Sequence, residues 1–294
     1  MESPRPIAAP PVTVASEAGA AGRWVFDPAR FAALGGAPAL AGLVAFVPRA
    51  WLRRVAGRET FLWPEGDADA CVVKRVRASR GRWANWGRTG REPREWWYEL
   101  LHRGRVRAAG CSEAENLREL GRAGFPVPRP IAAASADGVS LVLMEKVGHD
   151  SDLASALAEA PRARREAWLA ELAELVARLH AAGFYHRDLY LQHVVLPRES
   201  RGGASFVLLD CGRVRRERSP RERWFVKDLA ALAHSVPTNV GADEWRAFVA
   251  RYRERRGAGL ELEPLLAAID AKRARLAAHA PRHVDPDGGK RSRA

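Results

Sequence analysis

A short polar segment of this chain carries the side chains whose types and spacing could do chemistry. It begins with the triplet His186-Arg187-Asp188 and reaches a second imidazole at His193, five residues after the carboxylate. A carboxylate beside an alcohol can act as its general base. Phosphoryl transfer asks for little other covalent help, because positioning and charge neutralisation supply most of its catalysis. The segment is therefore a candidate catalytic loop, with Asp188 as the base.

The role of His193 is open between two possibilities. Its position suits a ligand of a metal ion that carries nucleotide phosphates. Mg²⁺ prefers oxygen ligands to an imidazole, however, so His193 could instead hydrogen-bond Asp188 or a phosphate.

Regular elements predicted on both sides position this loop. A run with helical spacing precedes it and reaches Leu179, and a short apolar strand, residues 194–196, follows it and is closed by Pro197. A polar loop between a helix and a strand is anchored at both ends. His180 lies just before the loop, and we expect it to brace the loop or fill the core and not to catalyse.

Three further motifs follow in the order that protein kinases show. Lys74 ends an apolar strand that starts at Cys71, residues 141–147 form an apolar strand and hinge, and Asp210 ends a third apolar run within an Asp-x-Gly motif. In kinases these elements contact the α- and β-phosphates, the adenine and the metal, respectively. Four motifs in this order are far more specific than the triplet alone. The residues whose backbone groups would meet adenine are Glu145 and Val147.

A predicted helix opened by Ser112 as N-cap offers a carboxylate to Lys74. Glu113 falls on the inward stripe of this helix, four and seven residues before two leucines, and is the preferred partner. Glu115 lies off that stripe. We expect Glu115 and Glu119 to be solvated, with Glu115 as the fallback partner.

Composition limits the class of protein. The chain has 294 residues, of which 47% are hydrophobic, and this is enough to bury one large core or two lobes. Its three cysteines are widely separated, which favours neither a disulfide framework nor a zinc site. No stretch is long and apolar enough to span a bilayer, and we find no signal-peptide core. We expect a protein of the reducing cytoplasm.

The chain is strongly basic, with a formal net charge of +13. Arginine supplies nearly all the excess, since lysine occurs only at Lys74, Lys146, Lys227, Lys272 and Lys290. Such a charge suits nucleic acid, an anionic membrane surface or a phosphorylated substrate. Part of it can also reflect a codon bias that replaces Lys with Arg. Because no aromatic-basic RNA motif or helix-turn-helix pattern is recognisable, nucleic acid is the least favoured partner.

We predict four regions along the chain. They are a disordered arm (residues 1–22), an N-terminal lobe (23–147), a C-terminal lobe (148–280) and a basic tail (281–294). The N-terminal lobe carries a tryptophan- and arginine-rich insertion at 75–110. Arginines between indoles suit a phosphorylated sugar-lipid, although indoles in a local core beside solvated arginines explain the pattern equally well. Gly57 stands nearly alone where kinases place a glycine-rich loop over the phosphates.

The segment after the Asp-x-Gly motif is short. Basic residues lead into a helix that contains Asp228, without the long activation segment and Ala-Pro-Glu motif of protein kinases. We expect Asp228 to accept backbone N–H groups of the catalytic loop. A helix starting near Leu153, capped by Ser151 or Asp152, opens the second lobe.

Three stretches resemble one family of kinases. They are HRDLYLQHVVL (186–196), LLDCGR (208–213) and RWFVKDLAAL (223–232). They resemble the bacterial lipopolysaccharide kinase family, which phosphorylates Kdo or heptose of the inner core, and the resemblance covers roughly residues 60–255. It implies a two-lobed, protein-kinase-like α+β fold, with an antiparallel sheet and one helix in the N-lobe and a helical C-lobe. The sparse glycine loop, Cys211 and the insertion depart from the family and leave the acceptor open.

The resemblance also implies a chemistry. It implies ATP and Mg²⁺ as cofactors and transfer of the γ-phosphate to an alcohol, at the cytoplasmic face of the inner membrane. The implied site residues are Asp188 and His193 for catalysis, Asp210 with His193 at the metal, Lys74 with Glu113 at the phosphates, and Glu145 with Val147 at adenine. This assignment requires the two aspartates and the lysine pair to share one crevice. The alternatives are a kinase of a soluble small molecule or protein, an inactive kinase-like scaffold, and a basic nucleic-acid-binding protein.

Overall fold

A computed structural model describes most of the chain in two compact units. The described residues are 14–15, 22–55, 57–77, 108–136, 138–199, 205–257 and 261–278. The first unit comprises residues 1–114 and 130–144, and the second comprises residues 115–129 and 145–294. Most of the predicted arm and insertion, and all of the predicted basic tail, lie outside the described residues. None of the helices found in the described ranges combines the length and the hydrophobicity that crossing a bilayer needs.

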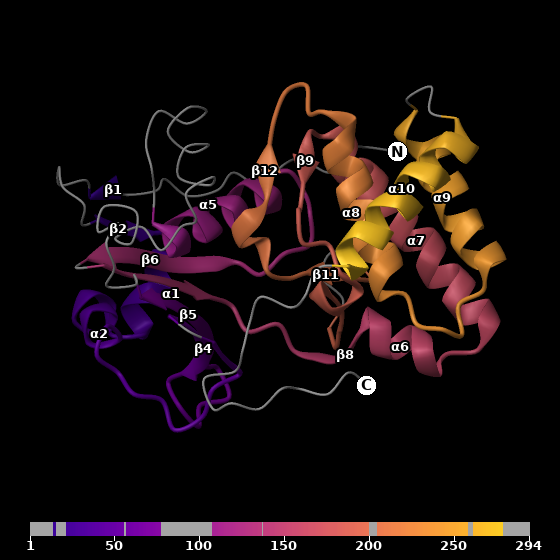
Figure 1. Ribbon diagram of the computed structural model, residues 1–294. Helices are drawn as coiled ribbons and strands as arrows, with labels where there is room; N and C mark the ends of the chain where they lie inside the picture. Colours follow the sequence, from indigo (N-terminus) through magenta and orange to yellow (C-terminus); the bar gives the residue numbers. More distant parts are fainter. Residues whose placement is uncertain are drawn as a thin grey trace, which may run out of the picture. The chain divides into compact units, whose positions relative to one another are not determined.

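An antiparallel sheet of seven strands forms the centre of the first unit (Figure 1). The strands follow the order β1-β2-β6-β7-β5-β4-β3. Their bounds are β1 (Val14–Ala15), β2 (Gly22–Val25), β3 (Arg53–Val55), β4 (Arg58–Trp63), β5 (Cys71–Arg77), β6 (Pro130–Ala136) and β7 (Val139–Met144). All six residues of β7 are buried, as a continuous apolar run in a central strand predicts.

The predicted arm contributes to this sheet. Val14 and Ala15 of β1 pair with Trp24 and Arg23 of β2, and β2 pairs with β6. The arm, predicted as disordered or extended, thus includes an extended strand at β1, which is too short for an apolar period to reveal in the sequence.

Two short helices, α1 (Pro28–Ala33) and α2 (Gly36–Gly42), complete the first unit. Asp27 caps α1 by accepting the Arg30 N–H at 3.0 Å, and Phe31 and Leu40 join the apolar core of the sheet. The prediction of a single helix in this lobe is therefore wrong. The alanine- and leucine-rich stretch after Gly35 is helical because it has an apolar core to pack against.

Helix α5 (Ala109–Arg122) differs from its prediction in two ways. It begins three residues before Ser112, which is 1% exposed within the helix and is not its N-cap. A Cβ at Gly110 would lie 2.7 Å from the Leu141 main chain, so glycine permits a close approach to β7. Residues 110–117 are all buried, and Glu115 is 6% exposed. The expectation that Glu115 is solvated is wrong, because this part of α5 is buried on all sides and not along one stripe.

Helices make up most of the second unit (Figure 1). They are α6 (Leu153–Glu159), α7 (Arg162–Ala181), α8 (Glu222–Ser235), α9 (Ala242–Arg256) and α10 (Leu262–Ala277). Helix α7 packs against α9, and α8 packs against α10. Asp152 caps α6 by accepting the Ser155 N–H at 3.0 Å, which confirms one of the two predicted caps.

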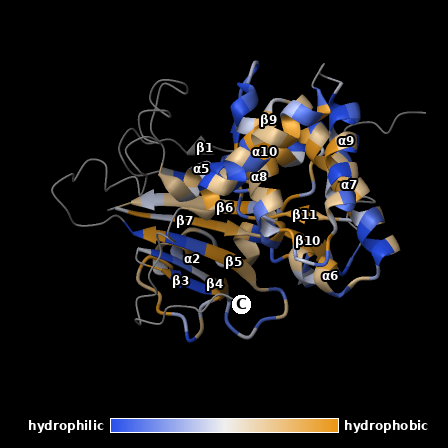
Figure 2. Ribbon diagram, turned by 45° about the vertical axis from the view of Figure 1, so that its right-hand side comes forward, coloured by the Kyte–Doolittle hydropathy of each residue, from blue (hydrophilic) through white to orange (hydrophobic). Residues whose placement is uncertain are grey.

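Short strands and single turns carry the polar loops of the second unit. One sheet joins β8 (His149–Asp152), β10 (Val194–Pro197) and β11 (Val207–Leu208), and a second joins β9 (Phe184–Tyr185) to β12 (Arg215–Arg216). Two 3₁₀ turns are η1 (Leu191–His193) and η2 (Cys211–Arg213). Strands β10 and β11 are hydrophobic, as Figure 2 shows. Only residues 214–221 separate η2 from α8, so the predicted absence of a long segment here is confirmed.

Candidate functional site

Asp228 holds the candidate catalytic loop from beneath. Its carboxylate is fully buried and accepts the backbone N–H groups of His186 and Arg187 at 2.5 and 2.6 Å. Arg187 has a φ of 73°, a left-handed conformation that costs energy for any residue except glycine. The two hydrogen bonds to a buried charge offset that cost. The predicted bracing role of Asp228 is thus confirmed.

Two buried histidines extend this bracing network. His180 Nε2 lies 3.4 Å from Asp228 Oδ2, and its Nδ1 lies 2.8 Å from the Tyr252 hydroxyl. His186 Nε2 donates to the Leu209 carbonyl at 3.0 Å, which ties the loop to the residue before Asp210. Burial lowers the pKa of both histidines, so both are neutral at physiological pH. His180 therefore braces the loop, as its sequence position predicts.

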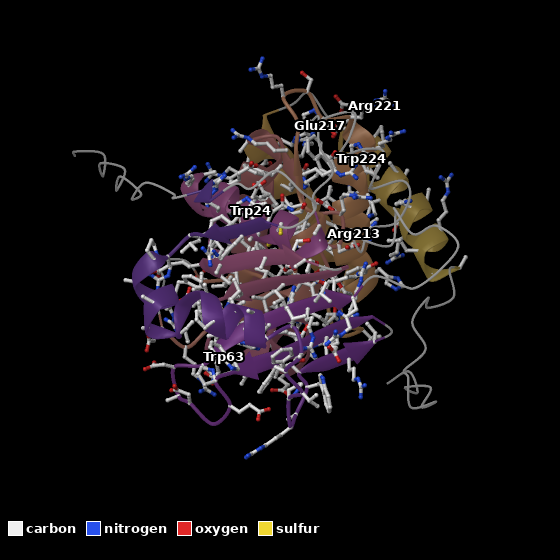
Figure 3. All side chains as sticks on the ribbon, turned by 90° about the vertical axis from the view of Figure 1, so that its left-hand side faces the viewer. Trp24, Trp63, Arg213, Glu217, Arg221 and Trp224 are labelled. Atoms are coloured by element: carbon white, nitrogen blue, oxygen red, sulfur yellow. The ribbon has the colours of Figure 1, made fainter. Side chains whose placement is uncertain are left out.

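Glycine and aromatic contacts fix the entrance to the loop. Gly183 has a φ of 81°, and a Cβ there would lie 2.3 Å from the Glu217 carbonyl oxygen. Trp224 of α8, labelled in Figure 3, stacks on Tyr185, and the ring centroids lie 5.4 Å apart. These contacts hold the strand pair β9 and β12 in place, and β9 leads directly into the catalytic loop.

Arg213 holds the carboxylate of Asp188. Its Nη1 donates to both carboxylate oxygens, at 2.9 and 3.1 Å, and the Asp188 side chain is 21% exposed. Sequence reasoning missed this partner. Arg213 is one of many arginines in a basic run, and only the η2 turn directs it to the loop. The ion pair fixes the orientation of the predicted base.

His193 forms a hydrogen bond to Asp188, one of the possibilities that the sequence left open. Its Nδ1 lies 2.8 Å from the main-chain carbonyl of Asp188 and must carry the proton, because a carbonyl only accepts. The Nε2 lies 3.8 Å from Asp210 Oδ2. A metal-binding histidine typically donates its second ring N–H to a carbonyl or carboxylate in this way. The bond to Asp188 therefore also leaves Nε2 oriented as a metal ligand.

Asp210 and His193 could supply two ligands to a magnesium ion that phosphates help to hold. Neighbouring ligands of octahedral magnesium lie about 3 Å apart, so the 3.8 Å between His193 Nε2 and Asp210 Oδ2 would have to shorten for both to bind one ion. No group of three or more His, Cys, Asp or Glu side chains in the described ranges could hold a metal by itself. Magnesium usually takes one or two protein ligands and the rest from substrate and water.

Asp210 itself is held in an unusual backbone conformation. Its φ is 54° and its ψ is 50°, in the left-handed region. Asn116 of α5 donates from Nδ2 to the Cys211 carbonyl at 2.9 Å. Strained residues cluster at functional sites when the surroundings fix them. Asn116 was not predicted, since nothing in the helical period distinguishes it from a solvated asparagine.

The first unit forms the predicted lysine–glutamate pair. Lys74 Nζ lies 2.5 Å from Glu113 Oε1, and their side chains are 21% and 9% exposed. Glu113, the preferred carboxylate, is thus a partner of Lys74. Lys74 and Glu113 lie in one unit and the two aspartates in the other, and the common crevice stays a prediction.

The predicted hinge residues follow β7. The backbone N–H of Glu145 donates to the Arg129 carbonyl at 2.9 Å, and its carboxylate accepts from the Arg129 guanidinium. The Val147 carbonyl lies 2.9 Å from His149 Nδ1, and the Val147 side chain packs with Val195 and Val207. An apolar floor therefore lies beside this segment. Adenine binding by Glu145 and Val147 stays a prediction.

Comparison with known sequences identifies relatives of this chain. Residues 83–252 match the model of the lipopolysaccharide kinase (Kdo/WaaP) family. The 3-deoxy-D-manno-octulosonic acid kinase of Haemophilus influenzae is 32% identical over 138 residues, which are 44% of this chain and 54% of that protein. The enzyme of the same name from Xanthomonas campestris pv. campestris (strain B100) is 31% identical over 142 residues, 47% of this chain and 54% of that protein. The chain thus spans about half the length of the curated relatives it matches.

A solved structure supports the fold. The chain is similar to a structure of WaaP in complex with acyl carrier protein, with a TM-score of 0.61 and 20% identity. The similarity covers 85% of this chain and 97% of that one. The mixed fold with antiparallel sheets is therefore the kinase-like α+β fold that the sequence predicts.

Proposed function

The chain belongs to the lipopolysaccharide kinase (Kdo/WaaP) family, and from this we propose that it transfers the γ-phosphate of ATP to a sugar hydroxyl of the lipopolysaccharide inner core. The names of its relatives favour 3-deoxy-D-manno-octulosonic acid (Kdo) as that sugar, ahead of heptose. The observation that carries the proposal is the loop geometry. Asp188 is oriented by Arg213, and Asp210 and His193 face each other 3.8 Å apart.

Asp188 acts on the acceptor. Its carboxylate accepts the proton of the sugar hydroxyl as the oxygen attacks the γ-phosphorus. Arg213 fixes the carboxylate plane through two hydrogen bonds, and His193 fixes the backbone by donating to the Asp188 carbonyl at 2.8 Å. A base positioned in this way needs no reorganisation when the acceptor arrives.

We propose nucleotide contacts for groups that the chain carries in each unit. Asp210 and His193 would hold a magnesium ion, which would neutralise the charge of the phosphates. Lys74, oriented by Glu113, would contact the α- and β-phosphates, and the backbone of Glu145 and Val147 would meet adenine. The proposal requires the two units to bring these groups together around one ATP.

The proposal is tested by incubating the protein with labelled ATP and Mg²⁺ and with deacylated core oligosaccharides that end in Kdo or carry heptose. Mass spectrometry locates the new phosphate. We expect phosphorylated Kdo and no product from the Asp188→Asn protein. Transfer only to a protein or to a free small molecule would contradict the proposed acceptor, and no ATP consumption under any condition would favour an inactive scaffold.

We propose in addition that the protein works in the cytoplasm, peripherally at the inner membrane. Val47 and Leu52 are large hydrophobic side chains that are 75% and 60% exposed. The exposed Arg53 and Arg54 are adjacent to Leu52 in sequence. Each suitably placed arginine contributes on the order of 1 kcal/mol at an anionic surface. Co-sedimentation with phosphatidylglycerol vesicles should fall for Leu52→Asp, and equal binding of both proteins would contradict this surface.

A further inference from the structure

One lysine of the second unit has no role in the mechanism above. Lys227 lies on α8 directly before Asp228, and its Nζ donates to the main-chain carbonyl of Arg187, the residue before Asp188. Within the part of the chain that the structure describes, Lys227 makes no ion pair with a carboxylate. Its ammonium thus lies beside the candidate base without a fixed counterion.

The surroundings of Lys227 are unfavourable for a cation that has only a structural role. The pKa of Lys227 is lowered to about 8, mainly by burial and less strongly by the charges of Arg213 and Arg187. The charges of Asp188 and, less strongly, Asp228 raise it. A carbonyl could be satisfied by a neutral donor at lower cost than by a partly buried ammonium. Such groups are more common at functional sites than elsewhere.

The contrast with Lys74 indicates what this ammonium is for. Lys74 lies 2.5 Å from Glu113, so a carboxylate already offsets much of its charge. Lys227 uses one N–H for the Arg187 carbonyl, and an ammonium has three. Two donors of the ammonium remain beside that bond to the residue before Asp188, and Asp188 exerts the strongest favourable influence on its charge.

We propose that Lys227 binds the phosphoryl group during its transfer. The bond between the γ-phosphorus and the bridging oxygen of ATP breaks, the bond to the acceptor oxygen forms, and the acceptor proton passes to Asp188. Lys227 keeps its proton throughout and donates to an oxygen of the phosphoryl group. The proposal rests on the phosphotransferase function. It adds a residue that binds the phosphoryl oxygens more strongly in the transition state than in the ground state.

Kinetics of three variants test the proposal. Lys227→Met should lower kcat by roughly 10²–10³-fold, as does loss of one donor to a transition-state oxygen, with the KM of the acceptor little changed. Lys227→Arg should keep a measurable part of the rate. Lys272→Met on α10 is the matched control and should match the wild type. Wild-type kcat in Lys227→Met would overturn the proposal.

Thermal unfolding separates binding from bracing. Lys227→Met removes an ammonium that burial disfavours but also the donor to the Arg187 carbonyl, so the two effects oppose each other and the midpoint should change little. A lower midpoint together with a higher KM for both substrates would assign Lys227 to bracing the loop and overturn its role in transfer.

The pH profile gives an independent signature. Only protonated Lys227 serves the phosphoryl group, so kcat should fall as pH rises through about 8. An arginine stays protonated far above that pH, so Lys227→Arg should move the alkaline limb upward by more than one pH unit. An alkaline limb at the same pH in both proteins would contradict the proposal.

Chemical labelling tests the site without any acceptor. Pyridoxal 5′-phosphate followed by borohydride modifies amines of low pKa beside phosphate sites, and the chain has only five lysines to map by mass spectrometry. We expect labelling at Lys227, and protection by ATP with Mg²⁺ but not by Kdo. Because this readout needs no transfer, it stands even if the proposed acceptor is wrong. Protection by Kdo alone would overturn the assignment to the phosphoryl group.

Discussion

The two units each bury a charged side chain against backbone groups, but they use it for different ends. In the first unit Arg75, 2% exposed, donates to the Leu43 and Phe46 carbonyls at 2.7 Å and pairs with Glu59 at 2.5 Å. It fastens the chain after α2 to the sheet. In the second unit Asp228 accepts two N–H groups from a loop that includes a residue of positive φ. The first charge secures the fold, and the second secures a strained site.

Because Arg75 secures the fold and Asp228 secures the loop, substitutions in the two regions should affect stability and turnover separately. Substitution of Arg75 should unfold the protein and leave the chemistry of the folded fraction intact. Substitution within the loop should do the reverse, and substitution of Asp228 should affect both properties. The expected effects are ordered below from the largest to the smallest.

The largest effect is expected from Asp188→Asn. It should lower kcat by about 10²–10⁴-fold, because an amide cannot accept the acceptor proton. The midpoint of thermal unfolding should change little, since Asn keeps the shape of the side chain and 21% of the Asp188 side chain is exposed. Steady-state kinetics and calorimetry on the same samples check both parts. Full activity would remove Asp188 from the chemistry.

Arg75→Met should lower the free energy of unfolding by about 3–5 kcal/mol, the usual result of removing one partner of a buried ion pair. Glu59 and two carbonyls would lose their common donor. Arg77 on the same strand is the matched control, because it is 43% exposed and contacts Val44. Urea unfolding should show less than about 1 kcal/mol for Arg77→Met. Equal losses in the two variants would contradict the special role of Arg75.

Asp228→Asn should affect both stability and turnover. An amide offers one acceptor oxygen where the carboxylate uses two, so one of the His186 and Arg187 N–H groups loses its partner. We expect a loss of about 2–3 kcal/mol in stability and a fall in kcat, because the loop loses its brace. Asp270→Asn, on the exposed face of α10, is the control. A stability loss with wild-type kcat would show that the loop geometry does not depend on Asp228.

Local pattern predicted the parts of this protein that depend on sequence spacing. The strand after the loop and the cap at Asp152 follow from periodicity and side-chain chemistry over a few residues. The pairing of Lys74 with Glu113 joins two such local patterns, a strand that ends in Lys74 and a helix with Glu113 on its inward stripe. Asp228 could be predicted as a brace from its place in the helix after the Asp-x-Gly motif, although it lies 40 residues after Asp188 in the chain. These elements agree between sequence and structure because their own residues determine them.

The missed features depend on approach in space. Arg213 reaches Asp188 because η2 turns it there, and Asn116 reaches the Cys211 carbonyl across 95 residues of sequence. Glu115 is buried because its segment of α5 is covered on all sides. Helical periodicity predicts one buried face, and it cannot predict that the opposite face is buried as well. The tryptophan-rich part of the insertion lies outside the described residues, and the two interpretations of it stay open.

The smallest effect expected, and the sharpest comparison of the two regions, comes from a pair of helix caps. Asp27 caps α1 in the first unit, Asp152 caps α6 in the second, and each accepts one backbone N–H at 3.0 Å. Replacing either with Ala should cost about 1 kcal/mol. If the units unfold independently, each substitution should lower only the transition of its own unit in a thermal scan. If both variants shift one common transition equally, the units unfold together, and Arg75→Met would then also lower the amount of active enzyme.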